Sequence, residues 1–381
     1  MCLISHAYLE EGYRSKLRQL GATIPLRLVT PKRFPFAYRE ATADFSAETS
    51  FDWRAYPCVF PLGIRSSTRW ILASRDLSLS GYQPDIVHVE NEVHSLSVLQ
   101  ALASRRLYAP RARMVVFVWA NQPLSGPKGF ILNAVSDRVR SRIDFFIAGS
   151  QEARALLTAA GVPPERSAVV PQVGIDADYF MPGSAIERQA ARAELGFMPG
   201  DFVLGFVGRF VESKGVLDLL EAAKLLKAEG TENLRLLFVG EGPLKSQILS
   251  HRPQAVVGMA EASAGLRRYY RAMDLLVLPS RTTPTWKEQF GRVLVEAMAT
   301  GVPVMGSDSG AVPEVVGDVG IVFEEGDVAE LASKIKRLQG DAELARDLAQ
   351  RGRQRAVIRY SGPAVAGATL EIYRRVLESP A

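Results

Sequence analysis

Basic side chains gather at one place in the C-terminal half of the sequence where they could bind an anionic ligand. Arg209 and Lys214 follow a short apolar run and belong to the segment GRFVESKG, in which Gly208 would let the backbone approach a ligand closely. An Arg and a Lys five residues apart can converge on one polyanion at the start of a helix. The alternative is that both side chains are simply exposed at a loop-helix junction.

A second segment, EQFGRVLVEAMA, combines a helix start with a carboxylate. Pro284 and Gly291 interrupt any longer helix, so we expect a helix to begin near Gly291 and Glu288 to lie in the loop before it. The first residues of this helix would present backbone N–H groups and the positive end of the helix dipole, which together attract an anion. These residues are Phe290, Gly291, Arg292 and Val293.

Glu296 lies inside the otherwise apolar stretch LVEAMA of the same segment. A bare carboxylate would be costly to bury there, so we expect a donor to pair with it. The alternative makes Glu288 a partner of the helix dipole and Glu296 a surface charge. A nearby GEGPLK segment fails as a dinucleotide-binding fingerprint because Lys245 takes the place of the third glycine, which disfavours a dehydrogenase.

Short apolar runs alternate with stretches of helical length along the whole chain, which is the pattern of parallel sheets built from strand-helix-strand units. The predicted strands are 2–5, 25–29, 85–88, 114–119 and 144–148, then 203–208, 234–240, 255–259, 275–280, 302–306 and 320–324. Helices are expected at 92–107, at 150–160, from about 216, and at 362–378. Residues 169–183 hold two prolines and two glycines without a sustained period, and we interpret them as a linker between two α/β halves.

The composition is that of a globular protein, with 47% hydrophobic and 23% charged residues. A length of 381 residues favours at least two domains. No stretch approaches the ~18 apolar residues that a membrane span needs and the N-terminus has no signal-peptide pattern, so we expect a cytoplasmic protein. Cys2 and Cys58 are too few for a disulfide framework, and no residue spacing is typical of a metal site.

Positive charge is concentrated in the N-terminal half. Residues 1–172 contain 21 Lys and Arg against 14 Asp and Glu, a net charge of +7, whereas residues 173–381 carry −2. A solvated surface, an anionic membrane or acceptor, and nucleic acid are the possible reasons for this excess. The basic runs lack the interleaved aromatic residues typical of nucleic-acid binding, so no nucleic-acid partner is expected. Membrane contact would make the protein peripheral, at the inner face of the membrane.

Several segments together resemble the family-4 retaining glycosyltransferases of GT-B fold. The resemblance rests on VPQVGIDADYF, VGRFVESKG, VGEGPL, VLPSRTTPTWKEQFGRVLVEAMATGVPV and SDSGAVPEVV, which span roughly residues 165–325, and its most specific element is the pair Glu288 and Glu296. It implies two Rossmann-like domains facing across a cleft, an acceptor domain at 1–172 and a donor domain at 173–361. It also implies that residues 362–381 form a helix crossing back to the first domain.

The same resemblance implies a retaining hexosyltransferase that uses a nucleoside-diphosphate sugar, no cofactor and no metal ion. Arg209 and Lys214 match the family positions that bind the donor diphosphate. Glu288 matches the position that binds the donor-sugar hydroxyls, and Glu296 matches the position that binds the ribose. Backbone at Gly258 and Met259 matches the nucleobase contact. The physical chemistry agrees, because transfer leaves negative charge on the diphosphate and oxocarbenium character on the sugar.

The acceptor side is less well specified. Gly12 is the single glycine after the first strand, where many members of the family carry a glycine-rich loop. Asn121 stands near the position of a family histidine after the fourth strand, and His88 ends the predicted strand at 85–88. His88 and His6 have a structural alternative, and we expect His94 and His251 to be exposed.

The acceptor could be a glycan, a lipid or a small glycoside. Two rival interpretations remain: a GT-B nucleotide-sugar epimerase or phosphorylase, and a non-catalytic protein that binds sugar nucleotides.

Overall fold

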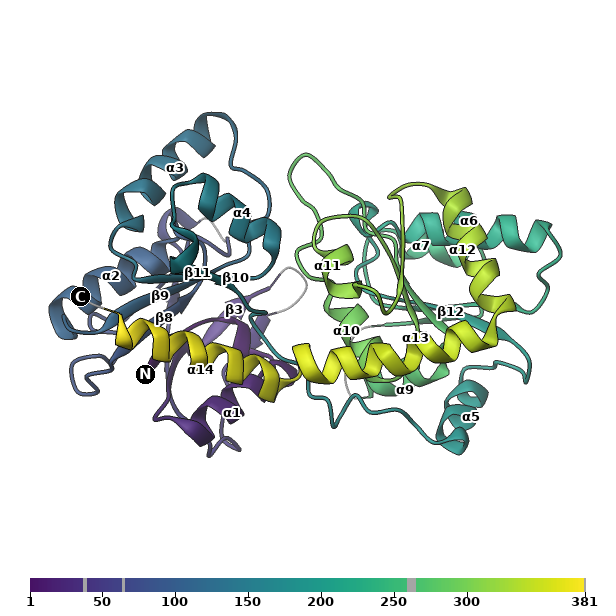
Figure 1. The fold of residues 1–381 in the computed structure, drawn as a ribbon, viewed down its shortest axis with the longest axis horizontal. Helices are drawn as coiled ribbons and strands as arrows, with labels where there is room; N and C mark the ends of the chain where they lie inside the picture. Colours follow the sequence, from purple (N-terminus) through teal and green to yellow (C-terminus); the bar gives the residue numbers. More distant parts are fainter. Residues whose placement is uncertain (37–39, 64–65, 259–264, 380–381) are drawn as a thin grey trace. The chain divides into compact units, whose positions relative to one another are not determined.

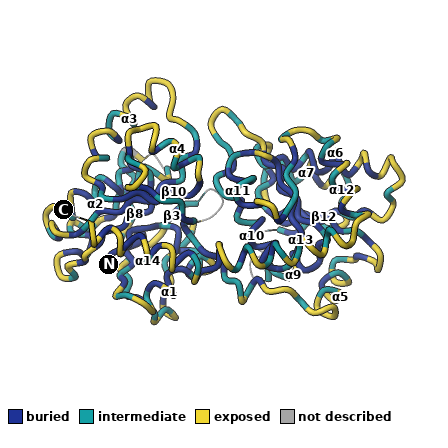
Figure 2. Tube along the Cα trace, in the orientation of Figure 1, coloured by how far each residue is buried: buried dark blue, intermediate teal, exposed yellow. Residues whose placement is uncertain are grey.

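The computed structural model describes the whole chain except residues 37–39, 64–65, 259–264 and 380–381. The chain divides into two compact units, one formed by residues 1–176 with 361–381 and the other by residues 177–360. Each unit contains one large sheet whose strands form the buried centre (Figure 2).

The N-terminal unit is built on a seven-stranded sheet in the order β11-β10-β9-β8-β1-β2-β5, and every neighbouring pair is parallel. Its strands are β1 Cys2–Ile4, β2 Arg27–Pro31, β5 Asp52–Tyr56, β8 Ile86–Glu90, β9 Arg113–Val118, β10 Phe145–Ala148 and β11 Ser167–Val169. The five strands predicted for this half are confirmed. The sequence pattern did not predict β5, whose residues DWRAY carry two charges, or β11, which ends where the expected linker begins.

Five helices belong to this unit in the described part of the chain: α1 Ser15–Thr23, α2 Leu96–Tyr108, α3 Gly126–Arg140, α4 Gln151–Ala159 and α14 Gly362–Glu378. Two hairpins, β3 Arg33–Pro35 with β4 Glu40–Thr42 and β6 Cys58–Val59 with β7 Ile71–Leu72, complete it. The helix expected at 92–107 begins four residues later because the Ser95 side chain caps it by accepting from the Val98 N–H.

The helix predicted at 362–378 is confirmed as α14, drawn in yellow in Figure 1. It packs on α1, and its apolar residues Val365, Ile372 and Val376 join the core of the N-terminal unit. Its Tyr373 hydroxyl lies 2.7 Å from Nδ1 of His88 in β8. The end of the chain therefore completes the unit in which the chain begins.

The C-terminal unit is built on a six-stranded parallel sheet in the order β14-β13-β12-β15-β16-β17. Its strands are β12 Phe202–Val207, β13 Leu234–Val239, β14 Ala255–Val257, β15 Leu275–Leu278, β16 Val304–Ser307 and β17 Ile321–Phe323, which confirms the six predicted strands. The described helices are α5 Ala185–Glu194, α6 Val216–Ala228, α7 Lys245–Ser250, α9 Leu266–Ala272, α10 Arg292–Ala299, α11 Val312–Val316, α12 Val328–Gly340 and α13 Ala342–Arg355, followed by the π-helical turn Ala356–Tyr360.

The strand order reverses once in each sheet. In the C-terminal unit the chain runs outward from β12 to β14 on one side and from β15 to β17 on the other, so the reversal falls between β12 and β15. In the N-terminal unit it falls between β1 and β8. Open parallel sheets bind ligands beyond the carboxyl ends of the strands at this point, because the loops on either side diverge there.

A buried ion pair anchors the first helix of the N-terminal unit to its sheet. Nζ of Lys16 in α1 lies 3.0 Å from a carboxylate oxygen of Glu90, and both side chains are almost wholly buried. The pair is fully embedded in hydrogen bonds, because Lys16 also donates to the Gln172 carbonyl, while the Tyr8 hydroxyl and the Gln172 amide donate to Glu90. Burial and the charge of Glu90 raise the pKa of Tyr8 well above its ordinary value, so the phenol remains a donor.

Replacing Lys16 should therefore destabilise the N-terminal unit strongly. We expect Lys16→Ala to lower the free energy of unfolding by about 3 kcal/mol, since it leaves the Glu90 carboxylate buried without its cation. The matched control is Lys224→Ala, which removes an exposed pair with Glu221 and should cost less than about 0.5 kcal/mol. Urea denaturation measures both. Equal losses in the two variants would contradict this role of the pair.

Candidate functional site

The strand reversal of the C-terminal unit brings two of the predicted site residues into contact. Lys214 ends the 3-10 turn after β12, and Glu288 lies in the loop after β15, as predicted. Because β12 and β15 are neighbours, the two loops meet, and Nζ of Lys214 lies 2.5 Å from Oε2 of Glu288. Only 15% of the Lys214 side chain and 7% of the Glu288 side chain are exposed, so the pair is shielded from solvent.

Neighbouring side chains fix the position of this pair. The Ser280 hydroxyl, fully buried directly after β15, donates to Oε2 of Glu288 at 2.7 Å. The Trp286 ring lies 4.7 Å from Nζ of Lys214, a cation–π distance. The Arg281 N–H donates to the Ser213 carbonyl, which joins the two loops through their backbones. Ser280 and Trp286 lie within the segments noted in the sequence, but only the fold aims them at Lys214 and Glu288.

The loop after β16 holds the Glu288 backbone from the other side. The Ala311 N–H donates to the Glu288 carbonyl at 2.9 Å, and Gly310 packs directly against that carbonyl. A Cβ at Gly310 would lie 2.1 Å from the Glu288 oxygen, and the φ of +56° is itself unfavourable for other residues. The loops after β12, β15 and β16 therefore form one connected surface around Glu288.

Glu296 is buried and paired, which rules out a surface charge. It lies one turn inside α10, accepts a 2.7 Å hydrogen bond from the Tyr270 hydroxyl and forms a 2.7 Å ion pair with Arg292. Burial and the Glu296 carboxylate raise the pKa of Tyr270 well above its ordinary value, so the hydroxyl stays protonated. Nothing in the sequence pointed to Tyr270, because its contact depends on how α9 packs against α10.

Helix α10 begins as predicted. Gly291 precedes it with a φ of +77°, a conformation that favours glycine, and Arg292 is its first residue. Phe290 packs edge-on against Tyr360 with ring centroids 5.6 Å apart. Val293 and Arg292 are half-buried in the first turn.

The remaining predicted donor residues lie at the carboxyl ends of β12 and β14. Gly208 follows β12, and a Cβ at Gly240 would lie 1.8 Å from its carbonyl oxygen, so the loops after β12 and β13 are in close contact. Arg209 is half-buried in the same loop. Gly258 follows β14 beside the Glu241 carboxylate, whereas Met259 lies outside the described residues.

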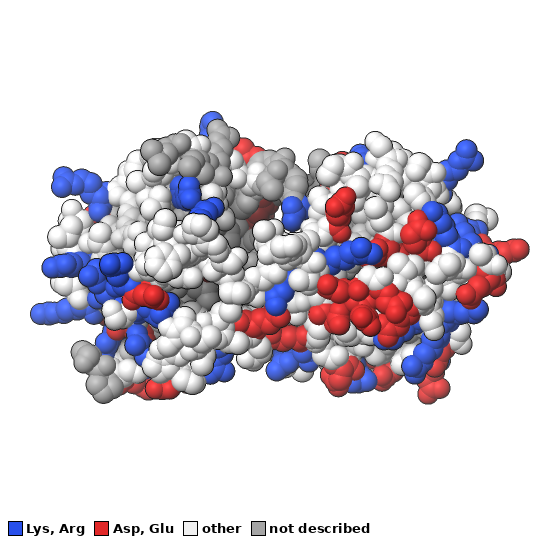
Figure 3. Space-filling view, turned by 90° about the horizontal axis from the view of Figure 1, so that it is seen from above, with Lys and Arg blue, Asp and Glu red and all other residues white. Residues whose placement is uncertain are grey.

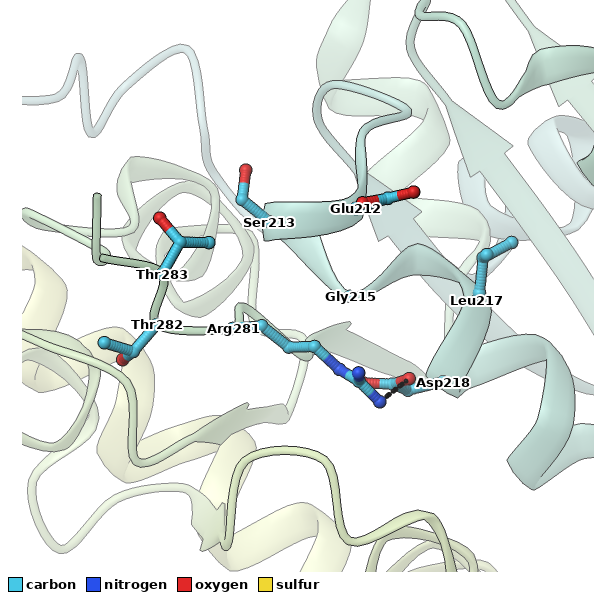
Figure 4. A pocket seen from close by; sticks show the side chains of 8 residues that line it. All are labelled: Glu212, Ser213, Gly215, Leu217, Asp218, Arg281, Thr282 and Thr283. Carbon is cyan, nitrogen blue, oxygen red and sulfur yellow. Dashed lines mark hydrogen bonds and ion pairs between the residues drawn. The ribbon is translucent and has the colours of Figure 1, made fainter. Parts of the chain in front are cut away.

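A hollow opens where the loops after β12 and β15 meet (Figure 4). Its residues are Glu212, Ser213, Gly215, Leu217, Asp218, Arg281, Thr282 and Thr283. Its basic residue, Arg281, is held by two hydrogen bonds of 2.7 and 2.6 Å to Asp218 in the first turn of α6. The charge of Arg281 is therefore already balanced by Asp218. This makes the hollow less suited to an anion than the surface next to Lys214.

The acceptor-side candidates of the N-terminal unit lie in different segments of the chain. Asn121 follows β9, is buried, and donates to the Glu152 carboxylate at 3.1 Å. Gly12 lies exposed in a 3-10 turn. His88 is fully buried inside β8 against Tyr373, and burial lowers its pKa well below the ordinary value, so the structural interpretation of this histidine is favoured.

Three other histidines differ in environment. His6 follows β1, packs against Phe34 with ring centroids 4.4 Å apart, and has a pKa lowered by burial to about 4. The expectation that His94 and His251 are exposed is wrong. Both are half-buried, and His251 Nδ1 lies 2.8 Å from the Gln247 carbonyl.

The described residues contain neither a cluster suited to a metal ion nor a helix suited to crossing a membrane. No group of three or more His, Cys, Asp or Glu side chains in that part of the chain is arranged to hold a metal ion. Among the helices described there, none combines the length and the apolar character needed to cross a bilayer.

Solved structures share the architecture of both units. Anabaena HepE, crystallised in complex with UDP, superposes with a TM-score of 0.71 at 19% identity, covering 98% of this chain and 99% of HepE. WaaG, described as a glycosyltransferase involved in lipopolysaccharide biosynthesis, gives a TM-score of 0.66 at 16% identity over 98% of this chain and 99% of WaaG. The fold is GT-B, with two Rossmann-like parallel-sheet domains, as predicted.

The sequence matches two family models, one described as glycosyl transferases group 1 over residues 187–355 and one as a glycosyl transferase 4-like domain over residues 12–172. A relative from Mycolicibacterium smegmatis, an alpha-maltose-1-phosphate synthase, is 30% identical over 281 residues, 68% of this chain and 70% of the relative. The chain belongs to the group 1 glycosyltransferase family.

Another relative is a D-inositol 3-phosphate glycosyltransferase of Nocardia farcinica, which is 35% identical over 230 residues. The match covers 56% of this chain and 48% of that protein, so the chain spans about half the length of this relative.

A substitution at Gly310 tests whether the loop after β16 holds Glu288 in place. We expect Gly310→Ala to lower the free energy of unfolding of the C-terminal unit by about 3 kcal/mol, because backbone strain adds to a clash with the Glu288 carbonyl. Gly230→Ala is the control, since Gly230 also has a positive φ, of +89°, but no atom within 4 Å of the added Cβ. It should cost about 1 kcal/mol. Denaturant titrations of the two variants give the comparison, and similar losses would mean that the loop contact does not hold Glu288.

Proposed function

We propose that the chain is a retaining glycosyltransferase that moves a hexose from a nucleoside-diphosphate sugar to an acceptor hydroxyl without a metal ion. The observation that carries the proposal is the contact between Lys214 and Glu288 at the strand reversal of the C-terminal unit. One cation for the diphosphate and one carboxylate for the sugar are thereby within reach of a single ligand.

The diphosphate would lie between Lys214, Arg209 and the start of α10. Transfer increases the negative charge on the leaving diphosphate, and in this proposal cationic side chains and helix N–H groups stabilise it. Glu296 would accept hydrogen bonds from the ribose hydroxyls, with Tyr270 and Arg292 holding its carboxylate in place. Backbone near Gly258 would contact the base.

Glu288 would orient the donor sugar rather than attack it. Its Oε2 already accepts from Lys214 and Ser280, and such a carboxylate is a weaker nucleophile than one without donors. When the donor binds, Lys214 would turn from Glu288 toward the phosphate. Glu288 would then bind the sugar hydroxyls that replace the lost partner.

The acceptor would be a glycan, a lipid or a small glycoside bound through the N-terminal unit, where Asn121 is a candidate contact. The relatives support an alcohol acceptor, because their names describe an inositol phosphate glycosyltransferase and a maltose-1-phosphate synthase. HepE was crystallised with UDP and with UDP-glucose, so uridine nucleotides are the first donors to test. A cytoplasmic location remains a prediction from the sequence.

A thermal-shift screen across nucleoside diphosphates and their sugars tests the donor class. A ligand present at 100 times its dissociation constant adds about 2.7 kcal/mol to the stability, which raises the Tm measurably. Product analysis with the best ligand then separates transfer from epimerisation, phosphorolysis and simple binding. A chain that binds none of these nucleotides would contradict the proposal.

Two substitutions in the ion pair should affect nucleotide affinity differently. Lys214→Ala should raise the Kd of the nucleoside diphosphate about tenfold or more, because a charge-assisted contact is lost. Glu288→Gln should leave this Kd unchanged or lower, because the carboxylate no longer competes for Lys214, while transfer falls at least about a hundredfold. Calorimetric titration and initial rates measure both, with Glu221→Gln, an exposed carboxylate, as control. Weaker nucleotide binding in both variants would refute the idea that Glu288 competes with the nucleotide for Lys214.

Metal independence has a direct test. Incubation of the protein with excess EDTA, followed by gel filtration into metal-free buffer, should leave the rate within about twofold of the untreated enzyme, because Lys214, Arg209 and α10 supply the positive charge. A rate that collapses and returns on adding Mg²⁺ or Mn²⁺ would show that a divalent ion takes part.

A further inference from the structure

Helix α3 of the N-terminal unit exposes its largest apolar side chains to solvent, whereas a helix that packs on a core buries them. The residues that it buries are Gly129, Ser136 and Val139, two of which are small or polar. Phe130 and Ile131, its largest apolar residues, are 78% and 62% exposed. Helices that serve only the core turn such side chains inward, so the outward direction of this pair requires an explanation.

The exposed apolar residues form a strip. Phe130 and Ile131 share a face of the helix with Ala134 and Arg138, at spacings of three, four, seven and eight residues. Leu124, 37% exposed, lies just before the helix. The outer side of α3 is among the exposed parts of the trace in Figure 2.

Positive charge surrounds this strip. Residues 126–142 contain four basic side chains, Lys128, Arg138, Arg140 and Arg142, against the single acid Asp137. Asp137 is paired with Arg140 at 2.8 Å, so the rest of the segment stays positively charged. Figure 3, which views the side on which α3 lies, shows an uncharged surface of the N-terminal unit bordered mainly by Lys and Arg.

We propose that α3 docks on the surface of an anionic lipid bilayer, with Phe130 and Ile131 inserted between the headgroups and Lys128 and Arg138 beside the lipid phosphates. Amphipathic helices with bulky apolar residues and flanking cations bind such interfaces. A stable protein interface buries about 800 Å² on each partner, whereas the large apolar side chains exposed on this helix are Phe130 and Ile131.

Flotation with vesicles tests the proposal. The intact chain is mixed with vesicles of phosphatidylcholine alone or with added phosphatidylglycerol, at low and at high salt. We expect binding to the anionic vesicles that weakens with salt and little binding to the neutral ones. The pair Phe130→Ser with Ile131→Ser should lower the apparent affinity at least tenfold, and Lys128→Ala should lower it about fivefold.

Ile186→Ser is the matched control, because Ile186 is 80% exposed on α5, a helix of the other unit. It should leave vesicle binding unchanged. Circular dichroism and nucleotide binding of all variants should match the parent chain, which separates a lost membrane contact from a lost fold or donor site.

Three outcomes would overturn the proposal. Equal binding to neutral and anionic vesicles would remove the electrostatic component, and unchanged flotation of the Phe130/Ile131 double variant would remove α3 from the contact. If light scattering shows a dimer that the double variant converts to a monomer, while vesicles bind neither form, the strip is an interface between two copies of the chain.

Discussion

The attraction between Lys214 and Glu288 is the interaction on which the candidate site depends. Two opposite charges are held 2.5 Å apart in a shielded position, and they come from loops that are 74 residues apart in sequence. Their meeting follows from the strand order, because β12 and β15 are neighbours at the reversal of the sheet. The pair is thus a product of topology, and the rest of the site is arranged around it.

Two buried Lys-Glu pairs in the described part of the chain differ in a way that separates structure from function. Lys16 and Glu90 are fully enclosed, and every group around them is another part of the N-terminal unit. Lys214 and Glu288 lie at the ends of strands and remain slightly exposed. An enclosed pair stabilises one conformation, whereas a pair at the strand ends can exchange its partners for those of a ligand.

Glycines let the loops of the C-terminal unit approach one another closely enough to hold the site. A side chain at Gly310 would strike the Glu288 carbonyl, and one at Gly240 would strike the Gly208 carbonyl. The distances that define the site therefore depend on the absence of side chains at positions with no chemistry of their own. Backbone contact of this kind gives a rigid frame, which a site for a charged ligand needs.

The amino-acid sequence by itself determined the element types and most of the donor residues. Apolar periodicity predicted eleven strands that the structure contains, since burial on a sheet requires that pattern. Local signals also predicted the start of α10 at Gly291 and the loop position of Glu288. Glu296 was expected to find a donor, because a bare carboxylate in an apolar helix is unfavourable.

Only the tertiary structure decided which groups meet. Tyr270 as the partner of Glu296, Ser280 as a donor to Glu288 and the enclosure of His88 against Tyr373 join residues from different elements. The outward direction of Phe130 and Ile131 was equally hidden, because the sequence of α3 does not say which face packs on the sheet. Periodicity and spacing report on neighbours along the chain, while these contacts are set by strand order and helix packing, which bring distant residues together.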